Sequence, residues 1–444
     1  MASLVSRIEI SDGVPDIPIP RGYSGLMALV TCEGMPLGDI RLRVCSDKIT
    51  SDYLTERIAE RFGPRIVELC LEAKLNGTGR DAQPTFSTTV IVPTSGRPEY
   101  LRRCLRSVSE LKYPNRAVLV VDNSDGCEQV RDLAKEHGAR YVREKKRGLD
   151  FARNAGLHAA SSDLVAYVDD DAVVDQAWLD WIAKAFQEDT AIACVTGLVM
   201  PCELETPAQE LFESYADGGM RRGYCPRVFD RFSINPLTAG KIGVGANMAF
   251  RASVLGTIGG FDEALDCGTP AKAGGEVDLL YRLLHSGFKV CYEPRALVWH
   301  SHRREMDELR GQLEGYSTAV YAFLTKCMLE YHDIGALRVG SRWIKGHHLK
   351  IRVRGTVGKG RQPWSLTVAE VKGVLRGPAA YLKAKSYVSH VRQLDGSERR
   401  GRLNRGKADA PAESRFDRRM SAVLAHLTGS GGRRKDVQCR SAHA

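Results

Sequence analysis

Between residues 88 and 168, short apolar runs alternate with segments of helical periodicity. The apolar runs are predicted strands, at residues 88–92, 117–121, 140–142 and 164–168. The segments between them are predicted helices, at residues 98–109, 128–137 and 150–160. Because strands separated by helices usually pair through right-handed crossovers, this pattern predicts an α/β fold, a mainly parallel sheet flanked by helices.

The segment before this sheet predicts a unit of its own. Residues 25–30 and 40–44 have the pattern of two strands, and residues 51–75 have the pattern of a helix. Together they indicate a small α+β domain over residues 1–85. The Gly- and Asn-containing residues 76–81 are typical of a linker.

The α/β domain is assigned to residues 86–304, and the chain after it is again helical in pattern. Residues 305–331 have a clear helical period and residues 377–391 a weaker one, which predicts a helical C-terminal extension over 305–395. Residues 396–444 are rich in Arg, Gly and Ser with few large apolar side chains. We expect this tail to be disordered, because it cannot bury enough apolar surface.

Composition narrows the class of protein. At 444 residues the chain exceeds one ordinary hydrophobic core. Its twelve cysteines stand singly without a CxxC pair, and no signal-peptide pattern opens it, so we expect reduced thiols and a cytoplasmic protein. The most apolar helical stretch, Thr318 to Leu329, contains Lys326, so no membrane-spanning helix is expected.

The charge of the chain is very unevenly placed. The net charge is +10, yet residues 338–444 contain 25 Lys or Arg against 7 Asp or Glu, which leaves 39 against 47 for the rest. A basic C-terminal region predicts a peripheral contact with an anionic membrane, on its inner face, and a solvated basic surface is the alternative. No specific nucleic-acid recognition is expected.

The most informative polar group follows the predicted strand 164–168, where Asp169, Asp170 and Asp171 stand in succession. Three adjacent carboxylates repel one another unless a cation lies among them, so the triplet suggests a metal–diphosphate site. Oxygen ligands of this kind suit Mg²⁺ or Mn²⁺. The alternative is a solvated Asp-rich turn before a helix that begins near Asp175.

Other polar groups lie where the predicted topology would bring them to the same edge. Pro93, Thr94 and Arg97 follow the first strand of the α/β domain, and Asp122 and Asn123 follow the second. Ligands of parallel sheets bind at the carboxyl ends of the strands. Three polar strand ends converging in one sheet therefore indicate a binding site.

Further along the chain, three more segments contain candidate site residues or mark the fold. Residues 240–250 are rich in glycine, and we expect them to loop over the edge of the sheet. Glu276 and Asp278 open a helix that runs to about His285. A short strand over 296–298 precedes His300 and His302.

These elements, in this order, resemble the family 2 glycosyltransferases with the GT-A fold, over roughly residues 86–304. The resemblance is carried by six segments besides the Asp triplet, at residues 89–94, 120–124, 148–154, 245–250, 259–262 and 276–278. It implies an inverting hexosyltransferase of polysaccharide or glycoconjugate biosynthesis. The donor would be a nucleotide-diphosphate sugar, with UDP- or dTDP-sugars favoured, and the acceptor a hydroxyl of a glycan, a lipid-linked sugar or a small molecule.

The resemblance also implies roles for individual residues. The expected nucleotide-sugar contacts are Pro93, Thr94, Arg97, Asp122, Asn123, Gly148, Arg153, Asp169 and Asp170. The expected ligands of the divalent cation are Asp169 and Asp171 of the DxD motif together with His300, and His302 is a weaker candidate. Asp122 would accept the imide N–H of a uracil or thymine ring.

The catalytic base is expected among Glu276 and Asp278, because an inverting displacement needs a carboxylate that deprotonates the attacking hydroxyl. The sequence departs here from the common family pattern of adjacent Glu and Asp. By register, Gly275 takes the Glu position and Glu276 the Asp position. Glu276 is therefore favoured, Asp278 remains a candidate, and both could instead simply favour the positive end of the helix.

Two other functions remain open at this stage. A sugar nucleotidyltransferase also places an Asp pair at a sheet end, but residues 95–98 are too short for its usual Gly-rich loop. An inactive GT-A module could act as a membrane or nucleic-acid binding protein through its basic C-terminus. The intact acidic residues argue against loss of activity.

Overall fold

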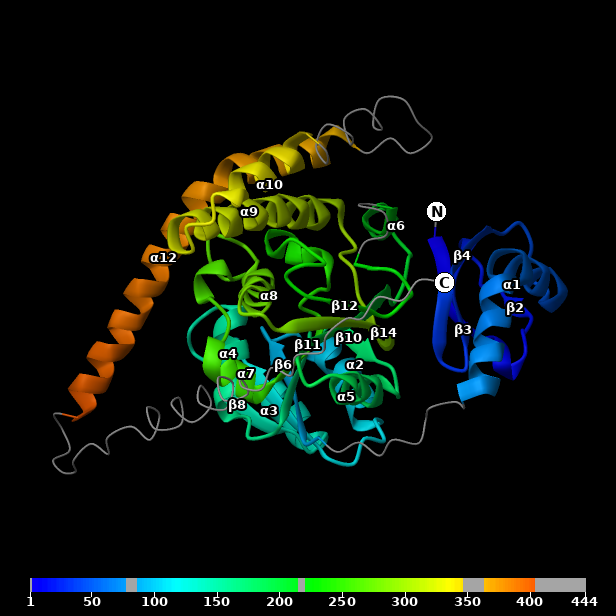
Figure 1. Ribbon diagram of the computed structural model, residues 1–444, viewed down its shortest axis with the longest axis horizontal. Coiled ribbons are helices and arrows are strands. Elements are labelled where there is room, and N and C mark those ends of the chain that lie inside the picture. The colour runs from blue at the N-terminus through cyan, green and yellow to red at the C-terminus, as the bar shows by residue number, and fades with distance from the viewer. Residues whose placement is uncertain (1, 77–85, 215–219, 346–362, 404–444) are drawn as a thin grey trace, which may run out of the picture. The chain divides into compact units, whose positions relative to one another are not determined.

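We describe the protein from a computed structural model, which covers residues 2–76, 86–214, 220–345 and 363–403 (Figure 1). The chain divides into two units, Met1–Val391 and Arg392–Ala444. The predicted site residues all lie in the first unit. Residues 404–444, most of the tail that we expected to be disordered, lie outside the described residues.

The centre of the first unit is a nine-stranded sheet with the path order β10-β14-β11-β13-β9-β6-β7-β8, in which β12 also pairs with β14. Four strands form a parallel half, β6 (Thr88–Thr94), β7 (Arg116–Asp122), β8 (Arg140–Arg143) and β9 (Leu164–Val168). The other five are β10 (Ala172–Val174), β11 (Ile192–Pro201), β12 (Arg227–Phe229), β13 (Asn247–Arg251) and β14 (Lys289–His300). In that half β11 and β14 are parallel, whereas β10, β12 and β13 are antiparallel to their neighbours.

Helices cover both faces of this sheet, as the alternation of strand and helix predicts (Figure 1). One face packs on α2 (Pro98–Ser109), α3 (Glu128–Glu136) and α5 (Trp178–Glu188). The opposite face packs on α4 (Leu149–Ala159), α7 (Ala252–Ile258) and α8 (Gly275–His285). Val90 and Val92 of β6 point to the first layer and Ile91 to the second, because successive strand side chains alternate between faces.

The remaining elements flank this α/β core. The N-terminal elements are β1 (Ala2–Glu9), η1 (Ile10–Asp12), β2 (Ile17–Pro18), β3 (Tyr23–Cys32), β4 (Met35–Arg43), β5 (Lys48–Ile49) and α1 (Ser51–Asn76), with an apolar cluster of their own. After β11 come α6 (Pro207–Ser214), η3 (Pro236–Lys241) and η4 (Glu263–Leu265). The C-terminal helices are α9 (Met306–Glu330), α10 (Gly335–Trp343) and α12 (Trp364–Leu403).

The structure corrects two expectations. Residues 247–251, expected as part of a loop over the sheet edge, form β13 in the middle of the sheet between β11 and β9. The glycines before β13 allow close approach instead: a Cβ at Gly243 would collide with Thr196. The helix α12 continues to Leu403, past residue 396 where we expected disorder to begin.

No helix among the described residues is both long and apolar enough to cross a membrane. Lys326, which interrupts the most apolar stretch in the sequence, lies in α9 with only 4% of its surface exposed.

Candidate active site

Asp169, Asp171 and His300 come together at the end of β9. The short strand β10 follows the Asp triplet directly and pairs with β14 so that Ala172 lies opposite His300. This pairing brings the imidazole Nε2 of His300 to 3.2 Å from Asp171 Oδ1. One ligand atom from each of the three residues lies within 4.8 Å of the others. Two carboxylates and an imidazole are a donor set that suits Mn²⁺, so these side chains fit a divalent cation.

At His300 and Asp171, burial and the neighbouring charges shift the pKa in opposite directions. Burial alone would lower the pKa of His300, but the neighbouring Asp171 carboxylate outweighs it and raises that pKa above its ordinary value. Burial would raise the pKa of Asp171, but His300 and Arg97 hold it below its ordinary range. Asp171 is therefore a carboxylate at neutral pH, as a metal ligand must be.

Arg97 and Thr94 hold the middle carboxylate of the triplet. The Thr94 hydroxyl donates to Asp170 Oδ2 at 2.6 Å. The Arg97 guanidinium forms an ion pair with Asp170 and donates from Nη1 to Asp171 Oδ2 at 2.8 Å. Burial nevertheless raises the pKa of Asp170 to about 6. Asp170 thus points to the first strand end, away from the group formed by Asp169, Asp171 and His300.

Asp122 and Asn123 lie at the end of the next strand. Asp122 is fully buried, and its carboxylate accepts from the Ser124 amide at 2.9 Å and from the Tyr141 hydroxyl at 2.7 Å. Asn123 donates to the Lys146 carbonyl at 2.6 Å and accepts from the Gly148 amide at 2.8 Å. Asn123 therefore fixes the loop before α4 through backbone contacts.

Gly148 and Arg153 belong to this loop and to α4. Gly148 has φ +144°, and a side chain there would collide with the carboxylate of Asp266. Asp266 accepts from the amides of Leu149 and Asp150 at 2.8 and 2.9 Å, so a distant residue caps α4. One turn later, Arg153 is 3% exposed and lies 3.5 Å from Asp169 Oδ1.

The charge of Glu276 acts on Arg153, the residue that also pairs with Asp169. Burial lowers the pKa of Arg153, but the carboxylates of Asp150, Asp169 and Glu276 together raise it well above its ordinary value. The charges of both Asp169 and Glu276 therefore act on the buried guanidinium of Arg153. Glu276 is half-buried in the first turn of α8, and its charge also contributes to raising the pKa of Tyr316, which burial raises first.

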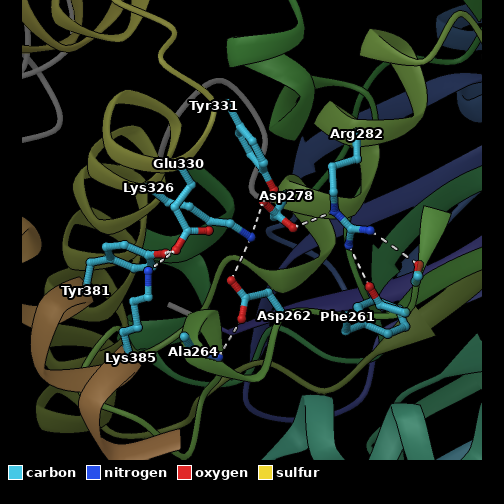
Figure 2. A network of polar contacts seen from close by, with 12 residues as sticks. Phe261, Asp262, Ala264, Asp278, Arg282, Lys326, Glu330, Tyr331, Tyr381 and Lys385 are labelled. Atoms are coloured by element: carbon cyan, nitrogen blue, oxygen red, sulfur yellow. Dashed lines mark hydrogen bonds and ion pairs between the residues drawn. The ribbon is translucent and has the colours of Figure 1, made fainter. Parts of the chain in front are cut away.

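Asp278, the other candidate base, has a different environment (Figure 2). It is fully buried, and its carboxylate is 2.7 Å from Lys326 Nζ, accepts from Arg282 Nε at 2.9 Å and accepts from the Tyr331 hydroxyl at 2.9 Å. Lys326 also pairs with Asp262 at 2.6 Å. Three donors and complete burial exclude an acceptor hydroxyl, so the geometry argues against Asp278 as the base.

The same network continues to the C-terminal helix. Glu330 of α9 accepts from the Tyr381 hydroxyl and from Lys385, both at 2.6 Å, and both of these residues belong to α12 (Figure 2). The Arg282 guanidinium donates to the carbonyls of Ile258 and Gly260. Asp278 therefore links α8 to neighbouring loops and helices. Glu276 lies in the first turn of the same helix.

His302 is not part of the group that could hold a cation. Its Nε2 lies 2.8 Å from Glu213 Oε1, and its Nδ1 lies 3.4 Å from Nδ1 of His300. Burial lowers the pKa of His302, against the opposing effect of Glu213. His302 thus packs behind His300 as a buried, hydrogen-bonded imidazole.

Sequence reasoning missed four charged residues near this site, Asp150, Glu213, Asp266 and Lys326. Asp150 and Asp266 resemble ordinary helix-start and turn residues in sequence, and only the fold brings them together. Lys326 alone gave a signal, because it interrupts an apolar helical stretch. Such a lysine is rarely buried without a carboxylate partner.

Known glycosyltransferases are similar in sequence to part of this chain. A model of glycosyl transferase family 2 matches residues 89–258. A pre-mycofactocin glycosyltransferase of Mycobacterium tuberculosis is 27% identical over 256 residues, which cover 56% of this chain and 50% of that relative. A glucosyl-dolichyl phosphate glucuronosyltransferase of Haloferax volcanii is 24% identical over 251 residues, which cover 54% of this chain and 77% of that relative. This chain thus spans half the length of the first relative.

Among solved structures, the chain is similar to the mannosyltransferase PcManGT from Pyrobaculum calidifontis in complex with GDP-Man and Mn²⁺. The TM-score is 0.39 and the sequence identity 17%, and the match covers 84% of this chain and 90% of that one.

Proposed function

We propose that this chain, whose residues 89–258 belong to glycosyl transferase family 2, moves a hexosyl group from a nucleotide-diphosphate sugar to a hydroxyl acceptor with the help of a divalent cation. The observation that carries the proposal is the group of Asp169, Asp171 and His300, linked through Arg153 to Glu276. Neither a nucleotidyltransferase nor an inactive binding module gains support from these findings.

In this proposal Asp169, Asp171 and His300 hold the cation, which offsets the negative charge that develops on the departing diphosphate. Arg97 and Arg153 supply fixed positive charge at the same edge of the sheet, each already oriented by a carboxylate partner. Guanidinium groups held in place in this way stabilise phosphate oxygens without reorganising during the reaction.

Glu276 is the proposed base. It is half-buried and stands in the first turn of a helix, whereas Asp278 two residues later is fully buried among three donors. The base must accept a proton from the attacking hydroxyl, so it must be within reach of that hydroxyl. A single displacement with a base opposite the leaving group inverts the anomeric centre.

The proposed donor carries uracil or thymine, on the resemblance of residues 120–124 to the family's base-binding strand; Asp122 is fully buried and already accepts from Ser124 and Tyr141, so an imide N–H would share an oxygen with one of these donors. The names of the two curated relatives, a pre-mycofactocin glycosyltransferase and a glucosyl-dolichyl phosphate glucuronosyltransferase, share only glycosyl transfer. The proposal therefore extends to no particular sugar or acceptor.

We test the function by measuring release of nucleoside diphosphate from UDP-, dTDP- and GDP-sugars with Mn²⁺, with Mg²⁺ and with EDTA. The expected result is turnover of a UDP- or dTDP-sugar that EDTA and Asp171→Ala both abolish. Asp132→Ala, on the exposed face of α3, is the control and retains activity. Turnover that survives both EDTA and Asp171→Ala would contradict the cation-assisted mechanism.

We also propose that the C-terminal region makes a peripheral contact with anionic lipid. The support is a row of exposed apolar side chains along α12, at positions 7, 4 and 7 residues apart: Trp364, Val371, Leu375 and Leu382. Spacings of 7 and 4 place them on one side of a helix, opposite the buried Tyr381 and Ala384. Exposed Lys372 and Lys383 flank this row, as in helices that lie on membrane surfaces.

Co-sedimentation with vesicles that contain phosphatidylserine tests this contact. We expect binding that falls as salt is raised and that Leu375→Glu/Leu382→Glu abolishes. Leu71→Glu, a matched change of an exposed leucine on α1, leaves binding intact. Equal binding by the double variant and the wild type would contradict the assignment of this surface.

A further inference from the structure

Asp150 is a buried acid at this site to which the proposed mechanism assigns no role, and burial raises its pKa above the ordinary value against the opposing effect of Arg153. Asp150 lies in the first turn of α4 with 2% of its surface exposed, and its Oδ1 accepts from Arg153 Nη1 at 3.0 Å. Arg153 is equally buried. A buried ion pair of this kind rarely adds stability over well-packed apolar side chains. Stability alone therefore does not explain why Asp150 and Arg153 are paired here.

The carboxyl of Asp150 occupies a notch that Gly275 leaves open. A Cβ at Gly275 would overlap Asp150 Oδ2 and lie 2.7 Å from its Cγ, and the three nearest atoms all belong to Asp150. Gly275 begins α8 and has no positive φ, so its backbone accepts any residue. The Asp150 side chain therefore excludes a side chain from position 275.

Arg153 is held on several sides. Besides its bond to Asp150, Nη2 lies 3.3 Å from the Gly245 carbonyl and 3.5 Å from Asp169 Oδ1, and the guanidinium stacks over the Phe261 ring. Asp150 is the only one of these partners that combines a full charge with a bond of 3.0 Å. Its carboxylate therefore fixes which way the guanidinium faces.

We propose that Asp150 is a positioning residue of the transfer reaction: from the notch at Gly275 it holds the Arg153 guanidinium beside Asp169. This inference rests on the proposed function. Without the bond to Asp150, we expect Arg153 to pair more closely with Asp169, which lies 3.5 Å away. Asp169 then binds the cation less tightly.

The first experiment tests the notch in the metal-free protein, independently of any activity. Gly275→Ala is expected to lower the melting temperature by several degrees when Asp150 is present, because the added methyl has no room. In the Asp150→Ala background the same change costs nothing. Equal effects of Gly275→Ala in both backgrounds would overturn the geometry on which the inference stands.

The second experiment tests the positioning role of Asp150. Asp150→Asn keeps the shape of the side chain, and we expect it to weaken Mn²⁺ binding in calorimetry by roughly tenfold to a hundredfold. We expect it to lower kcat by about a hundredfold, the cost of a displaced catalytic group. Returning a carboxylate to the same space from the other helix, in Asp150→Ala/Gly275→Asp, recovers part of both losses.

The outcomes separate this inference from the proposed function. A wild type that turns over a sugar nucleotide, together with an Asp150→Asn variant of unchanged kcat and Mn²⁺ affinity, would overturn the role of Asp150 alone. A wild type that neither binds Mn²⁺ nor turns over any sugar nucleotide would remove both. Loss of activity in Asp150→Asn with no recovery in the relocated variant would show a purely structural pair.

Discussion

Two groups of carboxylates in this domain differ in how far neighbouring cations balance their charge. Asp262 and Asp278 are matched by Lys326, which pairs with both, and Asp278 accepts two further hydrogen bonds. The Asp169–Asp171 group is shared among Arg97, Arg153 and His300, and Arg153 is already committed to another carboxylate.

The pKa directions separate Asp170 from Asp262, although the pKa of Asp171 is lowered like that of Asp262. Burial raises the pKa of Asp170 to about 6, and Arg97 only partly opposes it. Burial would also raise the pKa of Asp262, yet Lys326 more than offsets this and holds the pKa below its ordinary value. A fully compensated carboxylate fixes the fold. A group with surplus negative charge is the one that can take up a cation.

The largest expected effect separates the two acidic residues of α8. Glu276→Gln is expected to lower kcat by roughly a hundredfold to ten-thousandfold, because the base is lost, while the melting temperature stays the same. Asp278→Asn is expected to lower the melting temperature, because Lys326 loses one of its two counter-charges. Steady-state kinetics and thermal unfolding of both variants check this. The reverse pattern would make Asp278 the base.

The next prediction concerns the group of Asp262, Asp278 and Lys326. Lys326→Met is expected to lower the free energy of unfolding by about 1–3 kcal/mol, because the buried Asp278 carboxylate keeps Arg282 but loses the Lys326 ammonium. Lys326→Met/Asp278→Asn is expected to be less destabilised than Lys326→Met, since the negative charge that Lys326 balanced is gone. Urea denaturation measures both. A Lys326→Met protein as stable as the wild type would show that this network contributes little.

A smaller effect concerns the imidazole of the other group. His300→Asn removes one proposed ligand, and we expect Mn²⁺ affinity to fall by at least about tenfold in a calorimetric titration. His302→Asn, a change of the neighbouring buried histidine, is the matched control and lowers Mn²⁺ affinity less. Equal losses in the two variants would contradict the assignment of His300 as the ligand.

The smallest effect is a pH dependence of stability. The folded-state pKa of Asp262 is depressed below its ordinary value of 3.8, so its contribution is fully present above that value and is lost as the pH falls through the lower folded-state pKa. The difference in unfolding free energy between the wild type and Asp262→Asn should therefore shrink below about pH 4. A difference that grows at acid pH would contradict the ion pair with Lys326.

Much of the fold follows from the sequence because apolar periodicity is local. The strands and helices from β6 to β9 lie close to where the alternation of apolar runs placed them. The pattern did not predict β13, because its five residues directly follow a glycine-rich stretch that is typical of a loop. Helix α12 was foreseen only in part, because its one buried face repeats weakly along the sequence.

The site was predictable as far as residue type implies chemistry. The Asp triplet was found because three adjacent carboxylates suggest a cation, and His300 through the family resemblance; the structure brings Asp169, Asp171 and His300 together. The sequence favoured Glu276 over Asp278 by register but could not settle the choice, because the environment of Asp278 depends on Lys326, Arg282 and Tyr331, two of which are far from it in sequence. The same is true of Asp150, whose partner notch at Gly275 lies on another helix.

One titration tests the central claim most directly: Mn²⁺ binding to the wild type, Asp171→Asn and Asp262→Asn, followed by the loss of the free-Mn²⁺ electron paramagnetic resonance signal in the presence of UDP. We predict one site in the wild type that Asp262→Asn keeps and Asp171→Asn loses. A site that Asp171→Asn retains, or no site in the wild type, would contradict the account.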